Sequence, residues 1–202
     1  MNIIILSGSH REKSQSEKVS LYIQSNIKNQ KELNVDIISL AKNPIPFIDD
    51  DFLNGNDENW ARIWKPISSK LKEADGIIIV TPEWHGMSPS GVKNFLLLCK
   101  ANEVGHKAGL IVSVSAGMGG SYPIAELRMN SSKNTRICYI PEHLIIRDCH
   151  NVLNDKEPQS SNDSDIRKRI SYTTNLFIEY SSALKKVRDS GIIDLKNFPN
   201  GM

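Results

Sequence analysis

Several features are scarce in this sequence, and each scarcity excludes a class of protein. The 202 residues include only three cysteines, Cys99, Cys138 and Cys149, and no two of them form a CxxC pair. This argues against a disulfide framework and fits a reducing cytoplasm. No apolar run approaches the roughly 20 residues that a membrane-spanning helix needs. The apolar stretch at residues 2–6 is too short for a secretory signal, so we expect a cytoplasmic protein with no membrane partner.

An excess of one charge and the common phosphate-binding motifs are also missing. The formal net charge is only +2, so the chain has no bulk electrostatic attraction for nucleic acid. No GxxxxGK[ST] motif is present, and no GxGxxG motif follows the first apolar run, which argues against P-loop and Rossmann-type nucleotide sites. Four possible metal ligands match no known ligand spacing: Cys138, His143, Cys149 and His150. We therefore expect neither nucleic acid nor metal to bind.

The chain does contain a regular alternation of short apolar runs and longer amphipathic stretches. Nearly continuous β-branched runs predict strands buried on both faces, and they lie at residues 3–6, 35–38, 77–80, 110–114 and, with a weaker pattern, 143–146. The stretches that predict helices are residues 15–30, 58–74, 90–102, 120–133 and 165–188. This order predicts an α/β fold with a doubly wound parallel sheet and helices on both faces. Ligands bind such sheets beyond the carboxyl ends of the strands.

Two polar stretches and a tail complete the organisation. Residues 49–59 and 154–165 are rich in Asp, Asn and Ser and are predicted to be solvated loops, although a long loop can also form a lid or a subunit contact. The tail is predicted to pack on some surface through its apolar side chains and not to remain free: Ile192, Ile193, Leu195 and Phe198. We expect a single domain over residues 1–202, with residues 188–202 as a C-terminal extension.

The loop after the first predicted strand, residues 7–16, carries the donors that a phosphate dianion requires. A phosphate needs hydroxyl and amide donors, a cation and preferably a helix N-terminus. Gly8 lets the backbone turn closely, and the planar guanidinium of Arg11 matches phosphate oxygens in shape. The hydroxyl donors are Ser9, Ser14 and Ser16. Ser14 has a second interpretation, because residues 14–17 also form a capping box that would begin a helix.

The loop after the third predicted strand, residues 81–94, suits the edge of a flat heteroaromatic ligand. The residues expected to contact that ligand are Pro82, Glu83, Trp84 and His85. Trp84 would either cover the ring or serve as a half-exposed packing residue. We interpret the His85 side chain as a loop or interface histidine with no catalytic role. Lys93 and Asn94, further along, are expected to tie the following helix to neighbouring loops.

The loop after the fourth predicted strand, residues 113–122, is rich in small side chains. Small residues let the backbone approach the edge of a planar ring, where its amides can bond carbonyl oxygens or an anion. The expected contacts in this loop are Ser115, Ala116, Gly117 and Gly120. A glycine-rich turn alone is a weak indication, and its value here comes from its position beside the other two loops.

These three loops resemble the motifs of the NADPH-dependent FMN reductase family, which includes azoreductases, quinone reductases and chromate reductases. The family motif GSxRxxSxN is matched, with Ser16 in place of the asparagine, by Gly8, Ser9, Arg11 and Ser14. The second motif, PEYNxSxPGxLKNxxD, resembles residues 82–94. The third, a small-residue stretch ending in GG and followed by LR, is matched by Gly119, Gly120, Leu127 and Arg128. The resemblance covers roughly residues 1–150.

The sequence departs from the second motif at several positions. Trp84 replaces a tyrosine and His85 replaces an asparagine. One extra residue or a shifted glycine lies between Met87 and Gly91, and the acidic residue that usually follows the KN pair is absent from the apolar run at residues 95–98. These departures are compatible with flavin binding. They mean that the family's acceptor and its preference between NADH and NADPH do not carry over to this chain from the motif alone.

The resemblance implies a flavodoxin-like, five-stranded parallel sheet with strand order 2-1-3-4-5. It also implies bound FMN, reduced by NADPH or NADH through hydride transfer to N5, after which a small acceptor such as a flavin, quinone or azo compound takes the place of the nicotinamide. The flavin carries the chemistry, so no catalytic side chain is expected. A backbone amide within residues 83–85 would bond N5, and amides near Ala116 and Gly117 would stabilise the reduced ring.

The family resemblance bears on assembly as well. In this family a second subunit commonly completes the site, which implies a homodimer or a homotetramer. Residues 96–98 are candidate interface leucines, with core packing as the alternative for them.

Two other functional interpretations stay open. The protein could be a flavin-binding electron carrier without reductase turnover, although such carriers are typically strongly acidic and this chain is nearly neutral. It could also be a flavin-free binding or regulatory module, since Ser16, Trp84 and His85 depart from the family motifs.

Overall fold

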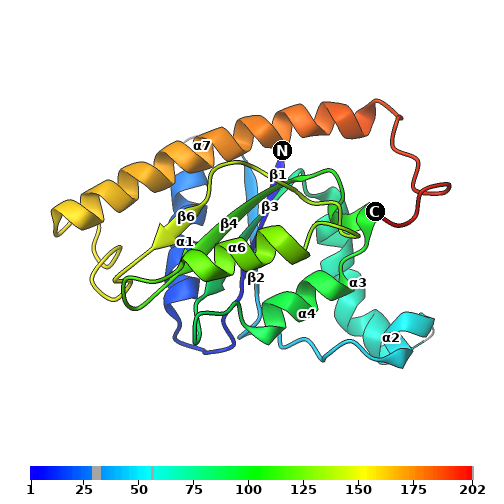
Figure 1. The fold of residues 1–202 in the computed structure, drawn as a ribbon, viewed down its shortest axis with the longest axis horizontal. Helices are drawn as coiled ribbons and strands as arrows, with labels where there is room; N and C mark the ends of the chain where they lie inside the picture. Colours follow the sequence, from blue (N-terminus) through cyan, green and yellow to red (C-terminus); the bar gives the residue numbers. More distant parts are fainter. Residues whose placement is uncertain (29–32, 56, 202) are drawn as a thin grey trace.

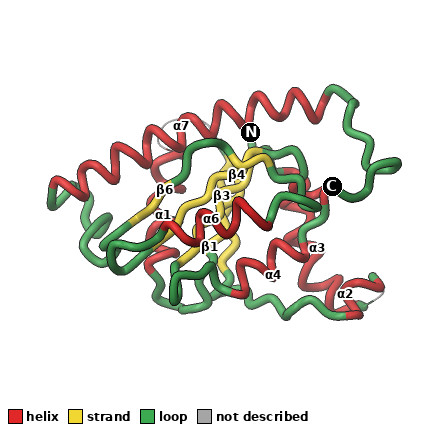
Figure 2. The backbone as a smooth tube through the Cα atoms, viewed as in Figure 1, coloured by secondary structure: helices red, strands yellow, loops and turns green. Residues whose placement is uncertain are grey.

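The computed structural model describes residues 1–28, 33–55 and 57–201. At its centre lies a six-stranded parallel sheet in the order β2-β1-β3-β4-β5, with β6 also paired to β4 (Figure 1, Figure 2). The strands are β1 Asn2–Ser7, β2 Asn34–Ser39, β3 Gly76–Pro82, β4 Ala108–Val114, β5 Cys138–Tyr139 and β6 Leu144–Ile146. The predicted doubly wound fold and its strand order are therefore confirmed.

The fifth position of the sheet is shared by two short strands. β5 pairs with the start of β4 at Ala108 and Gly109, and β6 pairs with its end at residues 112–114. Only β6 was predicted, and the expectation of five strands is corrected to six. A strand of two residues is too short to produce a pattern of its own, and Pro141 between the two strands has no N–H for the sheet.

Side chains along β1 alternate between two apolar layers. Ile3 and Ile5 join a cluster formed with α1 (Gln15–Lys28) and α7 (Ser161–Asp189). Ile4 and Leu6 pack on the opposite face with α3 (Glu58–Glu73), α4 (Ser90–Leu98) and α6 (Ser121–Asn130) (Figure 1). All four side chains are at most 3% exposed. Burial on both faces explains why the first strand is a continuous apolar run.

Several helices depart from their predicted bounds, including α6, which ends at Asn130 and not at residue 133. The predicted helix over residues 90–102 is broken, because α4 ends at Leu98 and a short helix, α5 (Ala101–Val104), follows. α7 begins at Ser161, four residues earlier than predicted, because the Ser160 hydroxyl accepts a hydrogen bond from the Asp163 N–H. α1 is described to Lys28, and the last two residues of its predicted range lie outside the described residues.

The described residues of the acidic stretch at 49–59 are mostly exposed, as predicted, but they do not form an open loop. It contains α2 (Asp50–Asn54), which begins at a capping bond from the Phe52 N–H to Asp49 and ends at Gly55 in a left-handed conformation. Phe52 packs edge-on against Trp60 and Trp64, with ring centroids 4.9 and 6.1 Å apart. This aromatic contact holds the stretch against the core, and the solvated-loop prediction overlooked it.

The C-terminal tail turns back to the body of the chain through polar contacts. The Phe198 carbonyl accepts a hydrogen bond from Arg136, and the Gly201 N–H donates to the Asn134 side chain at 3.2 Å. Ile192 and Phe198 nevertheless remain 77% and 67% exposed. Of the four apolar side chains predicted to pack, Ile193 and Leu195 are half-buried, whereas Ile192 and Phe198 are not covered. Within the described residues, no helix is both long and apolar enough to cross a membrane.

Candidate functional site

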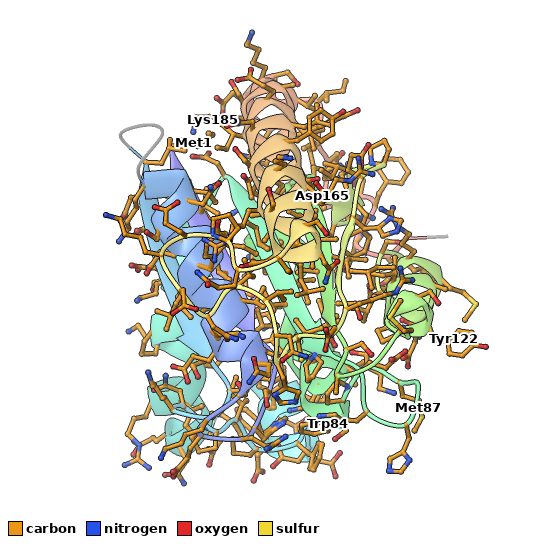
Figure 3. The ribbon with its side chains drawn as sticks, turned by 90° about the vertical axis from the view of Figure 1, so that its left-hand side faces the viewer. Met1, Trp84, Met87, Tyr122, Asp165 and Lys185 are labelled. Atoms are coloured by element: carbon orange, nitrogen blue, oxygen red, sulfur yellow. The ribbon has the colours of Figure 1, made fainter. Side chains whose placement is uncertain are left out.

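The three loops singled out in the sequence meet at the carboxyl edge of the sheet. They enclose a hollow of about 140 Å³ together with the segment that follows β6. Eight of the twelve predicted contact residues line it: Ser9, Arg11, Ser14, Ser16, Pro82, Glu83, Trp84 and Ala116. The other four lie nearby in the same loops but outside this lining: His85, Ser115, Gly117 and Gly120. Figure 3 shows Trp84 at this end of the molecule, with Met87 and Tyr122 to one side of it.

The first loop is pressed against β3 and against the start of α4. The Gly8 N–H donates to the Val80 carbonyl at 2.8 Å, and a Cβ on Gly8 would lie 2.8 Å from that same oxygen and overlap Val92. Only glycine fits there. Ser14 caps α1, because its hydroxyl oxygen accepts from the Glu17 N–H at 3.1 Å. The capping interpretation of Ser14 is thus the one the structure shows, and the hydroxyl proton can still be donated to a ligand.

Unpaired polar atoms face the hollow at the start of α1. Ser16 is 1% exposed, and its hydroxyl has no hydrogen-bond partner within the described residues. The side-chain oxygen of Gln15, which also lines the hollow, is likewise buried and unpaired. Arg11 is exposed, and its guanidinium forms no ion pair with the part of the chain that the structure describes. A buried hydroxyl without a partner calls for a ligand or a water. A phosphate at the helix N-terminus fits the Ser16 hydroxyl and the Arg11 guanidinium as donors, whereas the Gln15 oxygen is an acceptor.

The second loop forms a tight hairpin at the end of β3. The N–H and carbonyl of Trp84 exchange hydrogen bonds with those of Met87 at 3.0 and 2.9 Å. His85 and Gly86 between them have φ of +50° and +77°, which is the type I′ geometry of two-residue hairpins. The turn therefore requires residues that tolerate positive φ, and histidine is one of the few side chains enriched there.

Two of the three backbone amides of the hairpin that were candidates for bonding a ligand are already used within the protein. A ligand-bonding amide was predicted within residues 83–85. The Glu83 N–H donates to the Val114 carbonyl at 2.9 Å, and the Trp84 N–H is used by the hairpin itself. The His85 N–H is therefore the amide of these three that stays available to a ligand.

Polar side chains anchor the hairpin to the helices behind it. The Glu126 carboxylate accepts from the Ser88 N–H at 2.8 Å and from Lys93 Nζ at 2.9 Å. Burial raises the pKa of Glu126, but these two donors outweigh it and hold the pKa below its usual range. Asn94 bonds the carbonyl of Pro46 and the N–H of Ile48. Asn94 thus ties α4 to a neighbouring loop, as predicted, whereas Lys93 ties it to helix α6.

The third loop is joined to the hairpin by Glu83. The Ser115 hydroxyl donates to the Glu83 carboxylate at 3.0 Å. A Cβ on Gly119 would overlap that carboxylate, and a Cβ on Gly117 would meet nothing within 4 Å. The backbone at Gly117 is consequently open to the approach of a flat ligand.

The segment after β6 holds the third loop from the other side. The Asp148 N–H donates to the Gly117 carbonyl at 3.1 Å, and Arg147 Nε donates to the Gly119 carbonyl at 2.9 Å. Cys149 and His150 line the hollow itself. The sequence analysis considered these last two only as metal ligands. The topology could have identified them, because they follow the carboxyl end of the last parallel strand.

Cys149 is a buried thiol next to a lysine. Burial raises the pKa of Cys149 above its usual value, while Lys18 partly opposes this shift. Lys18 Nζ donates to the carbonyls of Cys149 and Val152 at 2.7 and 2.8 Å, so it also fixes the backbone behind the hollow. At neutral pH the side chain of Cys149 is a thiol, which makes it a wall of the site and not a nucleophile.

A family model of NADPH-dependent FMN reductases matches residues 1–151, three quarters of the chain. The chain belongs to this family. Membership makes it an oxidoreductase that uses FMN and NAD(P)H, and the resemblance found in the motifs is confirmed.

Relatives of this chain are named as azoreductases. It is 25% identical over 129 residues to the FMN-dependent NADPH-azoreductase of Staphylococcus saprophyticus, covering 64% of this chain and 68% of that one. It is 23% identical over 169 residues to the Staphylococcus aureus (strain USA300) protein of the same name, covering 84% and 89%. A flavoenzyme NAD(P)H:(acceptor) oxidoreductase from Paracoccus denitrificans, FerB, has the same fold, with a TM-score of 0.71, 17% identity and coverage of 90% and 97%.

The hairpin geometry gives a prediction for His85, which replaces the asparagine of the family motif. We expect His85→Gly to leave the free energy of unfolding within about 0.5 kcal/mol, because glycine adopts positive φ freely. His85→Val should lower it by about 1–2 kcal/mol, because a β-branched residue is strained there. Urea unfolding of both variants measures this. Equal stabilities would mean that the turn does not hold residue 85 at positive φ.

Proposed function

We propose that this family member uses the three loops to hold FMN and passes reducing equivalents from NAD(P)H to a small acceptor such as a free flavin, a quinone or an azo compound. The observation that carries the proposal is the buried, unpaired hydroxyl of Ser16 beside Arg11 at the start of α1. The relatives named for azo reduction support this class of acceptor.

In this proposal the first loop binds the phosphate of FMN. The hydroxyls of Ser9, Ser14 and Ser16 and the guanidinium of Arg11 are the donors, and the N-terminus of α1 adds its favourable dipole. Ser9 Oγ already accepts from the Arg11 N–H at 3.2 Å, which orients the loop while leaving the hydroxyl proton for the ligand. Charge-assisted donors of this kind give both affinity and orientation.

The second and third loops would hold the ring. The free His85 N–H and the open backbone at Ala116 and Gly117 supply donors and space, and Trp84 forms one wall. When bound, FMN supplies the hydride chemistry between nicotinamide and acceptor. No side chain is assigned as an acid, base or nucleophile. The protein positions the ring and offers amide dipoles to it.

A homodimer or homotetramer remains part of the proposal, as does a cytoplasmic location. Leu96 and Leu98 are at most 4% exposed and belong to the core, whereas Leu97 is 65% exposed. Of these three leucines, Leu97 is therefore the one available to a second subunit. Met129 on the neighbouring α6 is 81% exposed and adds to the apolar surface.

An absorbance spectrum tests the proposed function. Protein purified with added FMN should retain the flavin, and anaerobic NADPH should then bleach it at a rate that supports turnover with a quinone. Retained flavin that stays yellow with both NADPH and NADH would point to an electron carrier. Protein that retains no flavin would overturn the proposal in favour of a regulatory module.

A further inference from the structure

His10 is exposed, and its ring lies against the start of α4. It follows Ser9 in the first loop, and its imidazole rests on the backbone of Gly91, the second residue of the helix. A Cβ on Gly91 would overlap the imidazole at Cε1 and Nε2. The His10 ring therefore fills the space that the missing side chain of Gly91 leaves. This contact explains why the glycine of the second motif stands at position 91.

The same imidazole also faces the hairpin. Its ring centroid lies 6.5 Å from that of Trp84, with the planes tilted by 46°, within the range of favourable aromatic pairs. Trp84 is half-buried and lines the hollow, and Figure 3 shows it at the end of the molecule where the loops meet. One side chain of the first loop thus contacts both α4 and the tryptophan of the second loop.

We propose that His10 is a positioning residue that couples the phosphate-binding loop to the ring-binding hairpin through Gly91 and Trp84. The proposal rests on the proposed function, because the coupling matters only if the two loops hold one ligand. Arg11, the neighbour of His10, would contact the phosphate. His10 would fix the distance between the phosphate-binding loop and the hairpin. Losing the imidazole would then loosen Trp84 and weaken binding of the flavin ring itself.

A double-mutant cycle without any flavin tests whether the His10 imidazole lies against Gly91. In the wild-type background Gly91→Ala must displace the exposed His10 imidazole, so its effect on the urea midpoint should be less favourable than in a background without that ring. In the His10→Ala background the same change should leave the midpoint unchanged or raise it, since alanine favours a helix more than glycine does. An equal effect of Gly91→Ala in both backgrounds would show that the His10 imidazole does not lie against Gly91.

Flavins with and without phosphate test the coupling. His10→Ala should weaken FMN and riboflavin binding by the same factor, about tenfold, and His10→Phe, which keeps a flat ring, should restore most of it. Arg11→Met is the matched control and should weaken FMN alone, because riboflavin lacks the phosphate. If His10→Ala weakens FMN but leaves riboflavin unchanged, His10 acts only through the phosphate and the coupling is wrong.

Tryptophan fluorescence tests the contact between His10 and Trp84 directly. Trp60 and Trp64 are 7% and 6% exposed, whereas Trp84 is half-buried, so acrylamide reports mainly on Trp84. His10→Ala should increase quenching, and Trp84→Phe should abolish that increase. Unchanged quenching would overturn the contact. If the wild type binds neither flavin, the proposed function and the coupling both fail, while the urea cycle still decides where the His10 ring sits.

Discussion

Replacing Asp163 by alanine is expected to lower the free energy of unfolding by about 3–5 kcal/mol, the range measured when one partner of a buried ion pair is removed. The Asp163 side chain is 1% exposed and accepts from Arg167 Nε at 2.9 Å. It also accepts from the backbone N–H groups of Leu153 and Gln159 at 3.0 and 3.2 Å. The substitution would leave these two amides and much of a guanidinium without their acceptor, which is costly away from water.

Asp165→Ala is the matched control for this experiment. Asp165 lies one half-turn away on α7 and pairs with Lys168 at 3.3 Å, but both side chains are 75% exposed. Exposed pairs contribute about 0–1 kcal/mol, so this variant should unfold close to the wild type in urea. Similar losses for the two variants would show that Asp163 does not hold residues 153–160 in place.

The same carboxylate should make stability fall in acid. Burial raises the pKa of Asp163, but the bonds from Arg167, Leu153 and Gln159 outweigh it and hold the pKa below its usual value. The native state therefore binds its proton only at a lower pH than the unfolded state, so the stabilisation is present above the unfolded pKa of about 4 and is lost as pH falls through the native pKa. The stability difference between wild type and Asp163→Ala should shrink in that window.

Removing the guanidinium of Arg11 is expected to weaken FMN binding by about 10- to 100-fold. Hydrogen bonds to charged groups contribute about 1.5–3 kcal/mol, and 1.4 kcal/mol corresponds to a factor of ten in affinity. Arg11 lines the hollow and is exposed, and its guanidinium forms no ion pair among the described residues that would have to break first. Titration of FMN into Arg11→Met, followed by flavin fluorescence, measures the loss.

Two further variants separate the shape of the cation from its charge. Arg11→Lys keeps the charge but loses the planar fork, so it should give an intermediate affinity. Lys196→Met removes a charge from the exposed tail, far along the chain from the first loop, and should leave FMN affinity unchanged. Wild-type affinity in Arg11→Met would mean that the serine hydroxyls and the α1 N-terminus hold the phosphate without the arginine.

Much of the fold could be predicted because burial on both faces leaves a clear pattern. The run at Ile77–Val80 is apolar throughout, since β3 has helices above and below it. Phe52 could not be interpreted in the same way. A single aromatic residue among acidic ones has no periodicity, and only the positions of Trp60 and Trp64 on α3 make it a packing residue.

For the candidate site, the sequence identified the loops but not their hydrogen bonds. Residue types were sufficient to select Ser16, Arg11 and Trp84, which line one hollow. Which amide of residues 83–85 remains free depends on the closure of the hairpin and on the pairing of Glu83 with Val114. Such bonds follow from three-dimensional register, which no motif records. The support that Arg147 gives to the third loop was missed for the same reason.

The division of the fifth strand into β5 and β6 explains the role of Arg128 in the third family motif. Between β5 and β6 the sheet pairing is interrupted, so three successive backbone carbonyls there receive no hydrogen bond from a neighbouring strand within the described residues. Arg128 donates to all three, at 2.7, 3.1 and 3.2 Å: those of Ile140, Pro141 and Glu142. One guanidinium on α6 thus holds the segment between β5 and β6 in place. Leu127 beside it is fully buried, so the leucine and arginine that follow the double glycine hold the fold together.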